Sequence, residues 1–158
     1  MDISQYQKPD AIRRALAERR VAVVGLSSNE LRASNFVGFY LQRHGYEIVP
    51  VNPREEEILG VRCYPSLGDI EGPVGVVDVF RAPAAVPEIA REAAEIGARF
   101  LWLQFNVVSE EGIGIAESAG LEVIADRCLK IEHARYLGRM HWLGFNTGVI
   151  SAVRKPAV

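Results

Sequence analysis

Short apolar runs alternate along the chain with amphipathic segments, a pattern typical of α/β proteins. The apolar runs predict five strands, at residues 21–25, 47–53, 75–80, 98–105 and 121–126. The amphipathic segments predict helices at 10–19, 35–45, 83–96, 109–119 and about 127–136. The strand runs are apolar at successive positions, as expected for strands buried on both faces. The pattern therefore predicts a doubly wound parallel sheet of about five strands in a three-layer α/β/α arrangement.

Local signals predict where several of these elements begin and end. Asp10 is expected to cap the first helix, and Ser34 or Asn35 the second. Gly45 fits the position that follows the last helical residue of that second helix. The connection at 56–72 is long enough to carry a short edge strand.

Composition places the chain among ordinary globular domains. Its 158 residues are 49% hydrophobic and 24% charged, with a net charge of −2. This charge gives no basis for a broad nucleic-acid or anionic membrane surface, and no run reaches the roughly 18 apolar residues of a membrane span. Cys63 and Cys128 form neither a disulfide framework nor a zinc pattern, so we expect a cytoplasmic protein. We expect one domain over 1–136 and a tail, 137–158, that docks on it or contacts a second copy or another protein.

The strand ends supply the candidate chemistry, because ligands of open parallel sheets bind beyond the carboxyl ends of the strands. The first strand is followed by Gly25, Leu26, Ser27 and Ser28, and then by Ser34-Asn35 where a helix begins. Glycine lets a phosphate approach the backbone, and a helix N-terminus favours an anion. The same residues also suit a purely structural strand-to-helix turn.

The end of the second strand narrows the ligand class. The first loop lacks the G-x-G-x-x-G fingerprint of dinucleotide dehydrogenases, and Asn52-Pro53-Arg54 offers no acid for the ribose of NAD. A guanidinium at Arg54 suits a ribose phosphate instead, as in NADP or coenzyme A. Alternatively, Asn52-Pro53 is a rigid turn and Arg54 a solvated charge.

The third and fourth strands add polar groups without an obvious catalytic pair. Phe80, Arg81 and Pro83 follow the third strand, and Gln104 and Asn106 end the fourth. Phosphate and amide partners are therefore present, whereas no acid–base pair, and hence no catalytic residue, is identified. The five-residue spacing of Cys128 and His133 puts them on different helix faces, so no metal site is predicted.

These motifs together resemble a family of small stand-alone CoA-binding proteins of bacteria and archaea, related to the CoA-binding domain of the succinyl-CoA synthetase α subunit. The resemblance rests on VAVVGLSS (21–28), GYEIVPVNP (45–53), VVDVFRAP (76–83), LWLQFN (101–106) and ADRCLKIEH (125–133). It implies that residues 25–28 surround the pyrophosphate and that 52–54 lie near the adenosine and its 3′-phosphate. It further implies that residues 80–83 and Gln104 line the same cleft. Many relatives have glycine at the position of Asn106.

The resemblance implies binding of coenzyme A or an acyl-CoA by a non-catalytic carrier, sensor or regulatory module. The synthetase uses a phosphorylated histidine in a second domain, for which this chain has no room. Two alternatives stay open: an NADP-dependent enzyme of the same fold, and an interaction protein with a vestigial cleft. The adjacent arginine, Arg127, could lower the pKa of Cys128 and favour a mixed disulfide with coenzyme A; a buried structural cysteine is the competing interpretation.

Overall fold

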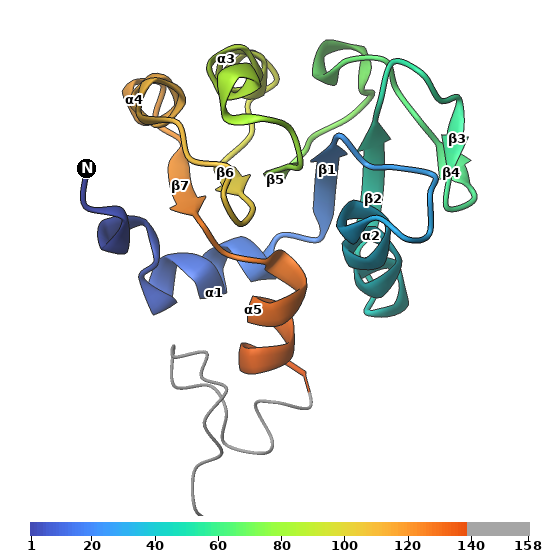
Figure 1. The fold of residues 1–158 in the computed structure, drawn as a ribbon, viewed down its shortest axis with the longest axis horizontal. Coiled ribbons are helices and arrows are strands. Elements are labelled where there is room, and N and C mark those ends of the chain that lie inside the picture. Colours follow the sequence, from blue (N-terminus) through green and yellow to red (C-terminus); the bar gives the residue numbers. More distant parts are fainter. Residues whose placement is uncertain (139–158) are drawn as a thin grey trace, which may run out of the picture.

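A five-stranded parallel sheet forms the centre of the computed structural model, which describes residues 1–138 (Figure 1). Its strand order is β2-β1-β5-β6-β7. The strands are β1 (Arg20–Val24), β2 (Glu47–Val51), β5 (Val76–Val79), β6 (Phe100–Leu103) and β7 (Glu122–Ala125). The predicted fold class, a doubly wound α/β sheet, is confirmed.

Helices cover both faces of the sheet (Figure 1). They are α1 (Pro9–Ala17), α2 (Ala33–Arg43), α3 (Val86–Glu95), α4 (Glu110–Ser118) and α5 (Leu129–Tyr136), with 3₁₀ turns η1 (Ile3–Tyr6), η2 (Leu67–Asp69) and η3 (Pro83–Ala85). One hydrophobic cluster joins the sheet to α3 and α4, and a second joins its other face to α1, α2 and α5. In the part of the chain that the structure describes, no helix has the length and apolar character needed to cross a membrane.

Strand register brings the carboxyl ends of the strands to one edge. Val24 pairs with Val79, Val79 with Leu103, and Leu103 with Ala125. The chain passes from β1 to β2 on one side and then crosses to β5 on the other side of β1. The loops after β1 and β5 therefore diverge at a topological switch point, where open parallel sheets bind ligands.

The helix starts differ from two expectations. Asp10 lies inside the first turn of α1, whose N-cap is Lys8 and whose first residue is Pro9. Proline suits this position, where its missing N–H is not needed. The N-cap of α2 is Arg32 and neither Ser34 nor Asn35, because both side chains turn back toward the preceding loop. The predicted end of α2 is confirmed: Gly45 has a φ of +85° just beyond it.

The long connection after β2 contains a hairpin instead of a strand of the main sheet. β3 (Glu57–Ile58) and β4 (Val61–Arg62) pair antiparallel as a separate two-stranded sheet. The connection touches the edge of β2 through an isolated bridge between Val51 and Tyr64. The expected docking of the tail falls almost entirely on residues 139–158, outside the described residues.

Candidate functional site

Gly25 follows β1 at a position where both the backbone conformation and the surrounding space exclude a residue with a side chain. Its φ is +85°, and its N–H donates to the Val51 carbonyl at 2.9 Å. A Cβ added here would lie 2.6 Å from the Phe80 carbonyl oxygen and 3.1 Å from Arg81 Cδ. Glycine is therefore what allows the loops after β1 and β5 to approach each other closely.

The loop after Gly25 is held by two side chains from the first turn of α2. The Ser27 N–H donates to Ser34 Oγ at 3.0 Å, and Asn35 Nδ2 donates to the Ser27 carbonyl at 2.9 Å. Both α2 side chains are buried. Leu26 is completely buried in the core, so it supports the loop from below and is not part of its surface.

Asn52 connects the end of β2 to the same loop. Its Nδ2 donates to the Leu26 carbonyl at 3.1 Å, while its Oδ1 accepts from the Arg54 N–H at 2.9 Å. The second bond makes a local turn that carries Pro53 and Arg54 outward, where both are exposed. Asn52 thus positions Arg54 beside the Gly25 loop.

Two hollows flank Gly25 and share it as a lining residue. The first, about 320 Å³, is lined by Gly25, Val51, Asn52, Pro53, Arg54 and Arg81. The second, about 340 Å³, is lined by Gly25, Ser27, Arg32, Ala33, Ser34 and Phe80. Three arginines and no carboxylate therefore stand among these described lining residues. Arg32 was missed by the sequence analysis, although its place directly before a helix is one that suits anion recognition.

The predicted site residues that line neither hollow are Leu26, Ser28, Asn35, Pro83, Gln104 and Asn106. Ser28 Oγ donates to Glu55 Oε1 at 2.7 Å, which brings a carboxylate to the loop that the sequence analysis did not identify. Pro83 begins η3 and is exposed. Asn106 has a φ of +62°, a left-handed conformation that favours glycine, and its N–H donates to Asp126 Oδ1 at 2.9 Å.

Gln104 is 4% exposed and hydrogen-bonded to a buried acid. Its Nε2 donates to Asp78 Oδ1 at 2.6 Å, and Asp78 is completely buried in β5. Burial raises the pKa of this carboxyl to about 7, against the opposing effect of the Gln104 hydrogen bond. Asp78 was not among the predicted site residues because it lies within β5, whereas the predicted residues lie at and beyond the strand ends.

Cys128 and His133 lie in separate environments, the first half-buried and the second buried. Burial raises the pKa of the Cys128 thiol, which favours the interpretation as a structural cysteine over a thiol activated by Arg127. The Arg127 side chain instead donates to Gln7 Oε1 at 2.9 Å. His133 Nδ1 pairs with the Tyr40 hydroxyl at 2.9 Å, and burial lowers the pKa of this imidazole to about 4.

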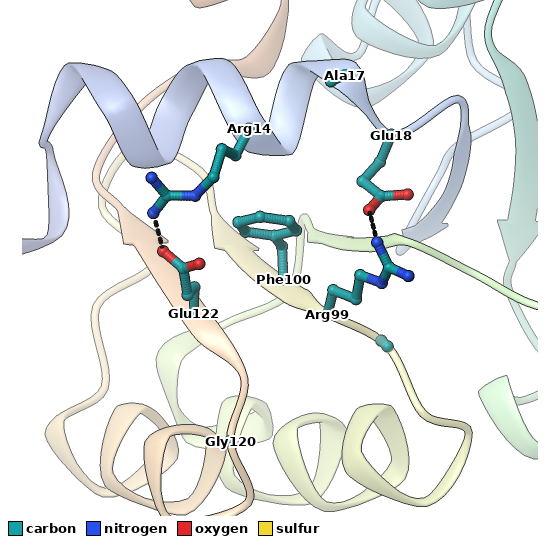
Figure 2. Close-up of a pocket in the computed structure, with 8 residues that line it drawn as sticks. Arg14, Ala17, Glu18, Arg99, Phe100, Gly120 and Glu122 are labelled. Carbon is teal, nitrogen blue, oxygen red and sulfur yellow. Dashed lines mark hydrogen bonds and ion pairs between the residues drawn. The ribbon is translucent and has the colours of Figure 1, made fainter.

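A larger cavity lies at the opposite edge of the sheet, where β6 and β7 begin. It has a volume of about 530 Å³ and is lined by Arg14, Ala17, Glu18, Ala98, Arg99, Phe100, Gly120 and Glu122. Figure 2 shows its charges already paired, Arg14 with Glu122 and Arg99 with Glu18 at 3.1 Å. Because ligands of parallel sheets bind at the carboxyl edge, size alone does not make this cavity the candidate site.

The fold is that of a doubly wound α/β domain, and the hollows at its switch point are lined by arginines. A model of the CoA binding domain matches residues 19–134. The chain belongs to this CoA binding domain family.

Similar proteins include both short and long chains. The uncharacterized protein YneT of Bacillus subtilis is 43% identical over 116 residues, which cover 73% of this chain and 86% of YneT. The ADP-forming acetate–CoA ligase II of Archaeoglobus fulgidus is 32% identical over 109 residues, or 68% of this chain but 16% of the ligase. A solved structure of a hypothetical protein from Pyrococcus horikoshii has a TM-score of 0.81 at 41% identity, covering 83% of this chain and 93% of that one.

Proposed function

We propose that this protein binds coenzyme A or an acyl-CoA at the carboxyl edge of its sheet and acts as a carrier, sensor or regulatory module without catalysing a reaction. Family membership supports coenzyme A as the ligand class. The observation that carries the proposal for this chain is the pair of hollows around Gly25, which together present Arg32, Arg54 and Arg81.

The chemistry of the two hollows matches the charged half of coenzyme A. The hollow with Arg54 and Arg81 would take the 3′-phosphate, since guanidinium groups bind phosphate through paired, charge-assisted hydrogen bonds. The pyrophosphate would lie across the Gly25 loop, near Arg32 and the start of α2. The protein has no net positive charge to attract an anion at long range, so local groups would supply the affinity.

An NADP-dependent enzyme is the alternative. The same hollows would accommodate NADP, because the 2′-phosphate of that nucleotide would face the same arginines. The carboxylate at the edge of the loop, Glu55, is bonded to Ser28 and does not line either hollow.

Calorimetric titration with coenzyme A, 3′-dephospho-CoA, NADP and NAD tests the proposal. Coenzyme A should bind about tenfold or more tightly than 3′-dephospho-CoA, because one charge-assisted contact is worth about 1.5–3 kcal/mol. Arg54→Ala should remove most of that preference, and what remains would come from Arg81 in the same hollow. Arg91→Ala removes an equal charge from an exposed position on α3 and should leave the preference unchanged.

Two results would contradict the proposal. NADP binding tightly while coenzyme A gives no heat would favour the enzyme of the same fold. No binding heat with any of the four ligands would favour a vestigial cleft in a protein that acts through protein interactions.

A further inference from the structure

The hydrogen bond between Asp78 and Gln104 fixes which way the Gln104 amide points. An ionised carboxylate accepts hydrogen bonds and cannot donate them, so Asp78 Oδ1 requires Nε2 of Gln104 as its partner. The amide oxygen, Oε1, then faces away from Asp78. Within residues 1–138, no donor bonds to Oε1, and Gln104 as a whole is 4% exposed.

Asp78 is an unusual partner because only half of its carboxylate is satisfied. Its Oδ2 is buried and has no hydrogen-bond partner among the described residues. Burial of a carboxylate with one unpartnered oxygen favours its neutral form. For Asp78, burial raises the pKa to about 7. Both charge states are therefore populated near neutral pH.

Gln104 lines neither hollow around Gly25, but it lies at the same carboxyl edge of the sheet. Along the carboxyl edge, Arg54 follows β2, the Gly25 loop follows β1, Phe80 follows β5, and Gln104 follows β6. If the phosphates lie at β2 and β1, the pantetheine arm continues past β5 to β6. Adjacent strands are about 4.8 Å apart, so this path is roughly 10 Å, a length that an extended pantetheine covers.

We propose that Asp78 and Gln104 form a proton-dependent amide switch that selects between free coenzyme A and its thioesters. With Asp78 ionised, Gln104 presents its carbonyl oxygen to the cleft, and a thiol S–H can donate to it. With Asp78 protonated, its O–H donates to Oε1, the amide turns over, and Gln104 presents N–H groups. A thioester has no S–H but offers a carbonyl oxygen, so it pairs with this second state.

The proton on Asp78, and not one on a neighbouring group, would control the switch. Its neighbours across the sheet, Val23 on β1 and Trp102 on β6, do not titrate. On the helical side, Cys128 at the start of α5 is the titratable group that the charge of Asp78 reaches, and both burial and that charge raise the thiol pKa. Cys128 therefore stays neutral while Asp78 ionises.

The inference rests on the proposed function, and titration with both coenzyme A and acetyl-CoA separates the two. In the wild-type protein, the preference for coenzyme A over acetyl-CoA should rise about fivefold between roughly pH 6 and pH 8, as expected for one hydrogen bond gained or lost. Asp78→Asn stays neutral and can donate to Oε1. Its preference should equal that of the wild type at the lower pH and should not change with pH.

Gln104→Met supplies a second variant, because it keeps a similar volume but presents neither donor nor acceptor. It should also give a preference independent of pH. A wild-type preference that is equal at both pH values, with both ligands bound, would overturn the switch and leave the proposed function intact. Binding of neither ligand would overturn the proposed function, and the switch would fall with it.

Discussion

Replacing Gly25 with alanine should destabilise the protein by more than its left-handed backbone alone explains. Forcing an alanine to a φ of +85° costs about 1–2 kcal/mol. The new Cβ would in addition lie 2.6 Å from the Phe80 carbonyl oxygen, a main-chain atom that cannot move without disturbing β5. Overpacking of this kind costs about 1–3 kcal/mol, so the total loss should be about 2–5 kcal/mol.

Gly45→Ala is the matched control for this prediction. Gly45 also has a φ of +85°, but a Cβ added there meets nothing within 4 Å in the described structure. The free energy of unfolding of Gly45→Ala should therefore fall only by the cost of the left-handed backbone, about 1–2 kcal/mol. The difference between the two variants isolates the contact with Phe80.

Urea denaturation followed by circular dichroism measures both free energies of unfolding, provided the two slopes agree. Gly25→Ala should fall below Gly45→Ala by about 1–3 kcal/mol, and its affinity for coenzyme A should also drop because the loop is displaced. Equal losses in the two variants would refute the claim that the β1 and β5 loops depend on a close approach at Gly25.

The remaining predictions concern charge and ionisation. Glu55→Gln should tighten coenzyme A binding several-fold in low-salt calorimetry, since it removes a carboxylate from the candidate phosphate loop but leaves an acceptor for Ser28; equal or weaker binding would contradict a phosphate there. Cys128 should react slowly with a thiol reagent at about pH 8 in the native protein and quickly after unfolding, because burial raises its pKa; rapid native modification would contradict this. The lowered pKa of His133 means that the unfolded chain binds the extra proton first, so this group removes stability as the pH falls from about 6.5 toward 4, by at most about 1.4 kcal/mol per pH unit. The stability difference between the wild type and His133→Gln should shrink across that range, and a constant difference would show that His133 titrates normally.

Much of the candidate site could be predicted because parallel strands impose it. Once the apolar runs are assigned to parallel strands, the residues that follow them must gather at one edge of the sheet. Gly25, Asn52 and Arg54 were found in this way, and the structure brings them to the same hollow. Asn106 was also placed at this edge, but its backbone carries it away from the hollows, toward Asp126.

The sequence by itself determined the succession of strands and helices along the chain, because hydrophobic periodicity is a local property. The alternation of strands with helices then predicted a parallel sheet, and the residues after its strands predicted a cationic carboxyl edge. The tertiary structure alone decided which side chains meet. Gln104 bonds to Asp78, and Ser28 to Glu55, across 26 and 27 residues of chain. Such contacts depend on strand register, helix placement and side-chain rotamers, and a local sequence pattern predicts none of these. For that reason Asp78, the buried acid bonded to Gln104, was identified only from the tertiary structure.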